Sequence, residues 1–321
     1  MIKVSLRVLP PVSSMFKFNF SNPDEETKTN GNDVSEVTTN DSKDSCTETL
    51  QWLPANEILP SSEQNLQLSV CIYPCGKYKL KHVPFEEAIK HLSGINGEEF
   101  IAEAEALHLD LLPGKYEGGL KIWECTRDLA DFLMREGIDF TGKQILDLGC
   151  GTGLLGILAM YLGAKSVHFQ DYVSENGSVI RAVTIPNVKM NTSELQKDGT
   201  VSSSRFFAGD WKDFADLMSA ELSENKNRYD FILTSETIYN PNNQRKLLAI
   251  FKECLKPGGV IYLAVKVHYF GVGGGIRQFQ NLLANDSSFQ TNVCWTCSQG
   301  CINALHSEGD LKNKIFSYIT L

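Results

Sequence analysis

The sequence predicts an α/β fold in which a mostly parallel sheet carries helices on both faces. Three observations lead to this prediction. Apolar segments of strand length alternate with segments of helical periodicity from residue 144 to residue 284. A glycine-rich turn, ILDLGCGTGLLGI (145–157), joins a strand to a helix. Polar clusters follow the predicted strands, and in such folds the carboxyl ends of the strands form one ligand-binding edge.

The segments before the glycine turn have weaker patterns. Alternating apolar residues predict a strand over 66–76. A short helix over 84–92 is expected to begin at Pro84, because acids occupy its first turn. A helical pattern of apolar residues then runs from Thr126 to Gly137. These elements are expected to pack beside the main sheet.

The strands and helices from the glycine turn onward follow each other in regular alternation. Gly163 ends the first helix, and Pro257 with the glycines after it ends the second. The predicted strands cover 144–149, 167–170, 205–208, 229–234 and 260–265, and the predicted helices cover 153–162, 242–255 and 276–284.

Residues 1–65 are predicted to be a disordered acidic extension. The segment 21–65 contains ten Asp and Glu residues and two Lys residues, which accounts for −8 of the net charge of −9. Such a composition buries too little apolar surface to offset the entropy of ordering. The remaining chain is nearly neutral, and it has no apolar run of the roughly 20 residues that a membrane span needs. We therefore expect neither direct nucleic-acid binding nor membrane insertion.

The nine cysteines are expected to be free thiols in a reducing compartment. Cys294, Cys297 and Cys301, with His306 after them, have a spacing that a metal site could use. Their segment is poorly patterned, so we predict no metal. The basic first 14 residues leave two alternatives open, a mitochondrial presequence or a start at Met15.

The glycine turn predicts a ligand with a nucleoside. Residues 151–156 fit G-x-G-x-x-G, which alone is weak evidence for a nicotinamide cofactor. Asp147 stands two residues before Gly149, and a carboxylate there would repel a pyrophosphate. The same carboxylate suits the cationic S-adenosylmethionine, so Asp147 is a candidate cofactor-binding residue. Asp171 ends the next strand, where a ribose diol would be held.

Several motifs together resemble one family. LDLGCGTG (146–153) resembles the first motif of seven-strand S-adenosylmethionine-dependent methyltransferases. YEGGLKIWECT (116–126), FQDY, IPNVKMN, SETIYNP (235–241) and HYFGVGGG (268–275) follow in the order found in the methyltransferase-like protein-histidine methyltransferases. The resemblance runs from about residue 107 to residue 289. It implies a Rossmann-like seven-strand sheet, with residues 66–321 as the methyltransferase domain.

The resemblance also implies which residues contact S-adenosylmethionine. Asp171 would bind the ribose hydroxyls, and Asp210 and Trp211 would flank the adenine. Gly149 and Gly151 would leave room for the methionine part of the cofactor, near Glu124. The full set implied by position is Ile122, Trp123, Glu124, Cys125, Thr126, Gly149, Gly151, Gln170, Asp171, Tyr172, Gly209, Asp210, Trp211 and Ser235.

The acceptor chemistry indicates the catalytic candidates. A lysine, of pKa about 10.4, must lose a proton before it attacks, whereas a histidine, of pKa about 6.5, is mostly neutral at pH 7. A histidine instead needs one nitrogen bare while the other donates its proton to a fixed acceptor. Glu236 is the first candidate for that acceptor and Glu124 the second. Tyr239 and His268 are expected to line the acceptor channel. The alternatives are a helix-capping role for Glu236 and a structural loop role for His268.

The resemblance implies a substrate and a location as well. The family methylates a histidine of the L-three protein of the large ribosomal subunit, and the chain is expected to act as a monomer in the cytoplasm, nucleus and nucleolus. A protein-lysine methyltransferase and an inactive cofactor-binding scaffold remain alternatives. His108 is a further candidate for self-methylation.

The C-terminus departs from the family pattern after about residue 293. Residues 313–321 can supply the last strand of the sheet. The strand before it has no clear pattern, so completion of the sheet is left open by the sequence.

Overall fold

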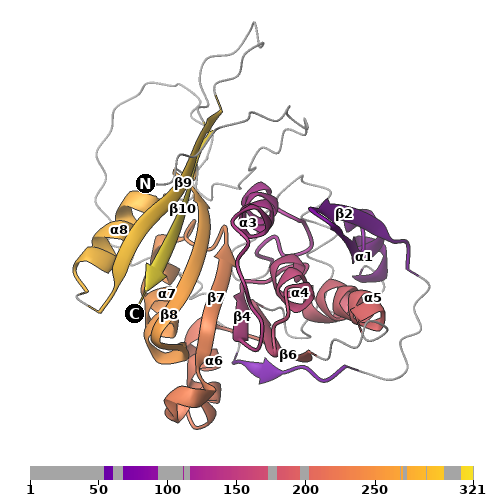
Figure 1. The fold of residues 1–321 in the computed structure, drawn as a ribbon, viewed down its shortest axis with the longest axis horizontal. Helices are drawn as coiled ribbons and strands as arrows, with labels where there is room; N and C mark the ends of the chain where they lie inside the picture. The colour runs from indigo at the N-terminus through magenta and orange to yellow at the C-terminus, as the bar shows by residue number, and fades with distance from the viewer. Residues whose placement is uncertain are drawn as a thin grey trace, which may run out of the picture.

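The computed structural model describes a large part of the chain, and it has the predicted α/β architecture. Figure 1 shows one twisted sheet with helices packed on both of its faces. The described residues are 54–60, 68–92, 111, 116–172, 179–195, 202–267, 269, 273–286, 288–299 and 312–320; in 297–299 and 312–320 only the backbone is described.

The main sheet has eight strands in the order β1-β6-β5-β4-β7-β8-β10-β9. Pairing is parallel from β6 to β8, and β1, β10 and β9 are antiparallel to their neighbours. The strand order reverses on either side of β4, so ligand binding is expected above its carboxyl end. The strands are β1 (Asn56–Glu57), β4 (Gln144–Leu148), β5 (Ser166–Asp171), β6 (Ser203–Ala208), β7 (Tyr229–Ser235), β8 (Leu255–Lys266), β9 (Gln290–Gln299) and β10 (Lys312–Thr320).

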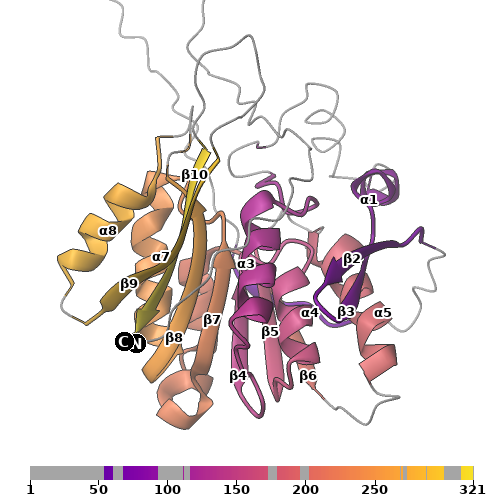
Figure 2. The ribbon, with the colours of Figure 1, turned by 45° about the horizontal axis from the view of Figure 1, so that its top comes forward.

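Two apolar clusters, one on each face of the sheet, form most of the core. The helices α3, α4 and α5 contribute to the first cluster, and α6, α7 and α8 contribute to the second. Figure 2 shows α3 and α4 in front of the strands and α7 behind them. The α-helices are α3 (Glu124–Arg135), α4 (Leu154–Tyr161), α5 (Ile185–Leu195), α6 (Trp211–Met218), α7 (Pro241–Cys254) and α8 (Ile276–Ala284). A π-helix, η1 (Ile180–Thr184), precedes α5, and two short 3-10 helices are η3 (Glu221–Ser223) and η4 (Asn225–Asn227).

The strands and helices predicted from residue 144 to residue 284 are confirmed within a few residues, apart from an early start of β8. Two helices were not predicted. The α5 segment contains Pro186 and several polar residues, and α6 is a single short amphipathic stretch between polar residues. Both helices depend on packing against the sheet, which a local pattern does not contain.

A hairpin replaces the single strand that was predicted over 66–76. It consists of β2 (Cys71–Cys75) and β3 (Tyr78–His82), which turn at Gly76 with φ of 56°, and α1 (Phe85–Leu92) follows as predicted. Asn187 of α5 accepts a hydrogen bond from the Val83 backbone at 2.7 Å and donates one to the Thr152 carbonyl at 2.9 Å. The buried Asn187 therefore connects the hairpin to the glycine turn.

Residues 54–58 do not behave as part of a disordered extension. Asn56 and Glu57 pair with the edge strand β6, and Ile58 is buried. Arg205 binds both carboxylate oxygens of Glu57, at 2.8 and 2.9 Å. The composition of 21–65 is an average over the whole segment, so it hides a short stretch that closes the sheet edge. The predicted domain boundary at residue 66 is therefore too late.

The C-terminal hairpin completes the sheet despite its unusual sequence. β10 pairs with β8 on one side and with β9 on the other. Among the described residues, no group of three or more His, Cys, Asp or Glu side chains is arranged to hold a metal ion, and no helix has the length and apolar character to span a membrane. His268, His108, Cys301, His306 and Met15 lie outside the described residues.

Candidate cofactor and acceptor site

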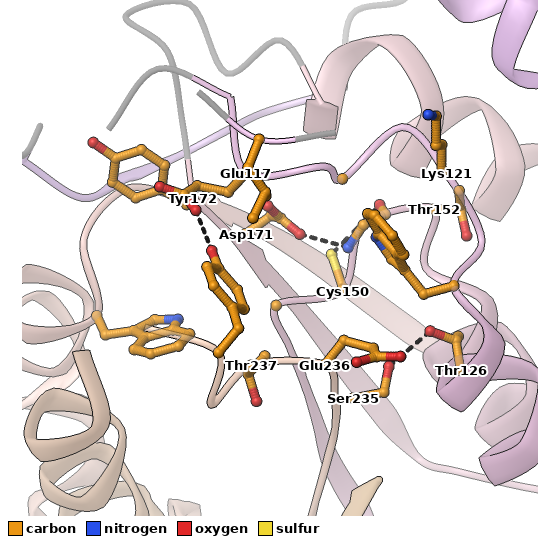
Figure 3. Close-up of a pocket in the computed structure, with 17 residues that line it drawn as sticks. Glu117, Lys121, Thr126, Cys150, Thr152, Asp171, Tyr172, Ser235, Glu236 and Thr237 are labelled. Atoms are coloured by element: carbon orange, nitrogen blue, oxygen red, sulfur yellow. Dashed lines mark hydrogen bonds between the residues drawn. The ribbon is translucent and has the colours of Figure 1, made fainter. Parts of the chain in front are cut away.

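A cavity lies at the carboxyl ends of β4, β5 and β7, the edge where the sequence predicted the site. About 700 Å³ of empty space, part of it open to solvent, lies between its lining residues. Figure 3 shows its lining side chains. They are Leu111, Glu117, Gly119, Lys121, Trp123, Thr126, Gly149, Cys150, Gly151, Thr152, Asp171, Tyr172, Trp211, Ser235, Glu236, Thr237 and Tyr239.

The glycine turn forms one wall of the cavity and needs its glycines. Gly149 and Gly151 have φ values of 65° and 50°, a region that side chains disfavour. A Cβ at Gly151 would lie 2.9 Å from the Gly119 carbonyl oxygen, and one at Gly149 would lie 2.6 Å from Thr237 Cγ2. A larger residue at either position would therefore displace the turn or the cavity residue opposite it.

Asp147 supports the turn from below and does not line the cavity. Its Oδ2 accepts the Gly156 N–H at 2.8 Å, and only 1% of the residue is exposed. Burial raises the pKa of Asp147 well above its usual range, although the Gly156 N–H opposes the rise. The expectation that Asp147 attracts a cationic cofactor directly is therefore wrong. Its place in the middle of a buried strand explains why it serves the turn instead.

Asp171 is a carboxylate that does reach the cavity. Its Oδ2 accepts the Gly151 N–H at 2.5 Å, and 6% of the residue is exposed. Burial raises the pKa of Asp171 to about 7; N–H groups of Gly151 and Tyr172 lower it, and the charge of Glu117 raises it. A carboxylate fixed in this way has acceptor capacity left for the two hydroxyls of a ribose.

Of Gln170, Gly209 and Trp211, which were predicted to contact the cofactor, only Trp211 lines the cavity. Trp211 lines the cavity, and its Nε1 donates to Gln170 Oε1 at 3.0 Å. Gln170 does not line the cavity; its Nε2 donates to the Gly209 carbonyl at 2.8 Å. Gln170 therefore holds the Trp211 ring from outside the cavity. Gly209 lies against the backbone of Ala55, also away from the cavity.

Asp210 has a structural role that the sequence analysis did not assign. Its Oδ1 accepts the Lys212 N–H at 2.9 Å and caps α6, and its Oδ2 pairs with Lys246 at 2.6 Å. Because both oxygens are engaged and the residue does not line the cavity, Asp210 positions Trp211 at the start of α6.

Only some side chains of the segment YEGGLKIWECT line the cavity. Trp123 and Thr126 line the cavity, whereas Ile122, Glu124 and Cys125 do not. α3 begins at Glu124, so successive side chains rotate away from one another around the helix. Thr126 Oγ1 lies 2.7 Å from Ser235 Oγ, which joins this helix to the end of β7.

Glu236 is held in a strained loop directly after β7. Its φ of 58° is the one positive value among the described non-glycine residues, and such strain is often found at functional sites. The Glu236 N–H donates to the Ala264 carbonyl at 2.9 Å. Its Oε2 accepts the Tyr269 hydroxyl at 2.7 Å, and its Oε1 lies 3.6 Å from Lys266 Nζ. Glu236 is 7% exposed and lines the cavity.

Tyr239 and Glu117 meet on another side of the cavity. The Tyr239 hydroxyl donates to Glu117 Oε2 (Figure 3), and burial raises the pKa of Tyr239 well above its usual range. Glu117 was not predicted as a site residue, although it lies in the distinctive YEGGL stretch. Gly119, Lys121, Cys150, Thr152 and Thr237 also line the cavity without having been chosen, and all stand within motifs already singled out.

Binding of S-adenosylhomocysteine is expected to weaken about tenfold from pH 8 to pH 6. With a pKa of about 7, Asp171 is mostly ionised at pH 8 and mostly protonated at pH 6. The ionised carboxylate is the stronger acceptor for ribose hydroxyls, so affinity rises with pH. Titration calorimetry across this range measures the effect. The Asp171→Asn variant should show no such slope, and a flat profile in the unchanged protein would contradict the assignment.

These features together fit a nucleoside cofactor with a charged amino-acid end. The glycine turn leaves room for close backbone approach, Asp171 offers a buried carboxylate, and Trp211 offers an aromatic wall. A mostly parallel sheet that ends in an antiparallel hairpin, with this site at its carboxyl edge, defines an S-adenosylmethionine-dependent methyltransferase. Comparison with known proteins agrees, because residues 123–313 match the family described as "Methyltransferase domain".

Curated relatives specify the family further. The histidine protein methyltransferase 1 homolog of Mus musculus is 37% identical over 279 residues, covering 81% of this chain and 75% of that protein. The Bos taurus homolog is 44% identical over 223 residues, covering 64% and 58%. The Dictyostelium discoideum homolog is 44% identical over 174 residues, covering 54% and 51%. The chain thus belongs to the histidine protein methyltransferase 1 family. It spans about half to three quarters of the length of these relatives.

Proposed function

We propose that this chain transfers a methyl group from S-adenosylmethionine to a ring nitrogen of a histidine in a protein substrate. The observation that carries the proposal is the Glu236 carboxylate, which faces the cavity from a strained loop and is held by Tyr269 and Lys266. Figure 3 shows Glu236, Ser235 and Thr126 grouped apart from Glu117, Asp171 and Tyr172. This separation supports assigning one side of the cavity to the ribose and the other to the acceptor.

The proposed chemistry requires orientation more than proton removal. The bound cofactor supplies an electrophilic methyl group on its sulfonium. Glu236 would accept the N–H of a neutral imidazole, which leaves the lone pair of the other nitrogen to attack in line. Attack makes the ring cationic, so the same carboxylate stabilises the charge that develops. The methylated ring loses its N–H proton to water after the product leaves the site. Asp171 would hold the ribose while this occurs.

Replacing Glu236 by glutamine is expected to lower kcat about 100- to 1000-fold. The amide keeps the size of the side chain but cannot stabilise a cationic ring. Labelled S-adenosylmethionine, a histidine-containing substrate protein and amino-acid analysis of the product measure the effect. Glu253→Gln on the exposed face of α7 is the control and should keep full activity. Methyl-lysine in place of methylhistidine would refute the proposed acceptor.

We further propose a large-subunit ribosomal protein, the L-three protein, as the substrate of a monomeric enzyme. The order of the motifs from YEGGLKIWECT to HYFGVGGG supports this proposal. A ribosomal substrate would be met where it is made and where subunits assemble, so residence in the cytoplasm, nucleus and nucleolus is proposed with it. Transfer of label to the purified L-three protein, and none to a variant that lacks its histidines, is the expected result.

A further inference from the structure

We propose that Lys266 restricts the acceptor to a neutral nitrogen, so that histidine is methylated and lysine is excluded. The inference deepens the proposed function and rests on it, because it names the residue that selects between two acceptor types. Lys266 acts through Glu236 and is a positioning residue rather than a catalytic one.

Lys266 occupies the place of a counter-ion inside the protein. It is the last residue of β8 and only 7% of it is exposed. Its Nζ lies 3.6 Å from Glu236 Oε1 and 6.0 Å from the centre of the Trp123 ring. Both Glu236 and Trp123 line the cavity. A positive charge therefore stands directly behind the wall that faces the acceptor.

Tyr269 forms a second connection between Lys266 and Glu236. The backbone N–H of Lys266 donates to the Tyr269 hydroxyl oxygen at 3.2 Å, and that hydroxyl donates to Glu236 Oε2 at 2.7 Å. One oxygen of Glu236 is thus held by Tyr269, and the other faces the Lys266 ammonium. Because Tyr269 is only 4% exposed, this network cannot move toward solvent easily.

A carboxylate that already has an internal cation treats two acceptors differently. A lysine arrives as an ammonium, so it would bring a second positive charge beside Lys266 in a site with little water. It must also shed a proton, and a carboxylate paired with a cation accepts that proton poorly. A neutral imidazole brings no charge and needs only a hydrogen-bond acceptor. The Glu236 carboxylate can still accept a hydrogen bond while it is paired with Lys266. The pairing therefore favours histidine.

The first test compares acceptors in the full-length protein. The measured quantity is kcat/KM for the histidine substrate and for the same substrate with lysine at the acceptor position. We expect Lys266→Met to lower the histidine-to-lysine ratio at least about tenfold and to produce methyl-lysine, while Lys266→Arg keeps the ratio. An unchanged ratio in an active Lys266→Met variant would overturn the inference and leave histidine methylation by the unchanged protein intact.

A second test uses the unchanged protein, so it can be carried out even if the Lys266→Met variant does not fold. Peptides of the substrate sequence carry lysine or norleucine at the acceptor position; norleucine has the same carbon chain as lysine without the terminal ammonium. Each peptide is titrated into the unchanged protein in the presence of S-adenosylhomocysteine. We expect the norleucine peptide to bind at least about tenfold more tightly. Equal affinities would overturn the inference. Methylation of lysine instead of histidine by the unchanged protein would refute the proposed function itself.

Discussion

Replacing Asp171 by asparagine is expected to weaken binding of S-adenosylhomocysteine by at least about 100-fold. A hydrogen bond to a charged group contributes about 1.5–3 kcal/mol, and the ribose offers two hydroxyls. The loss of about 3 kcal/mol corresponds to a factor of about 100 in Kd. Asparagine has one oxygen, and Gly151 N–H already uses an oxygen of this side chain at 2.5 Å. The amide nitrogen would then face the ribose, and an amide nitrogen cannot accept a hydrogen bond from a ribose hydroxyl.

Titration calorimetry with S-adenosylhomocysteine measures this loss directly. Asp216→Asn is the matched control, because Asp216 lies on the exposed side of α6 and its side chain is 66% exposed. Its Kd should stay within a factor of two or so of the unchanged protein, as for most surface substitutions. Tight binding by Asp171→Asn would show that the ribose is held elsewhere.

Replacing Gly274 by alanine is expected to reduce methyl transfer more than about 100-fold and to lower stability by about 1–3 kcal/mol. A Cβ at this position would lie 2.0 Å from the Tyr239 carbonyl oxygen and 2.4 Å from that of Ile238. These are backbone atoms of the loop that carries Glu236, so relief of the clash must move the loop. A displacement of about 1 Å at reacting groups is enough to cost about 100-fold in rate.

Activity and thermal unfolding distinguish this effect from a general loss of stability. Gly258→Ala is the control, because its φ of 75° is unfavourable for alanine but nothing lies within 4 Å of the added Cβ. We expect that control to lose about 1–2 kcal/mol of stability and to keep its activity. Full activity in Gly274→Ala would show that the loop is positioned independently of the glycine run.

Strong local patterns account for the part of the fold that the sequence predicted. The parallel strands are short apolar runs that end in polar residues, and a glycine-rich turn joins the first of them to a helix. The edge of the sheet that holds the cavity follows from these patterns alone. Asp171 could be predicted as a ribose-binding residue because it ends the strand that follows the glycine turn.

Contiguous motifs were less informative about single side chains. Ile122 and Cys125 pack into the core while Trp123 and Thr126 face the cavity, because a helix begins within the motif. Gln170, next to Asp171, faces away from the ligand because adjacent strand residues point to opposite sides. A motif therefore identifies a neighbourhood, and the local geometry decides which of its members make contact.

The sequence by itself determined the class of fold, the cofactor edge and the family, because these depend on short-range periodicity and on motif order. Only the tertiary structure decided how the carboxylates are used. Asp147 is removed from the cavity by burial, Glu117 meets Tyr239 from 122 positions away, and Lys266 meets Glu236 across two strands. The charge and direction of a buried carboxylate depend on partners brought together by folding, and no local pattern encodes those partners.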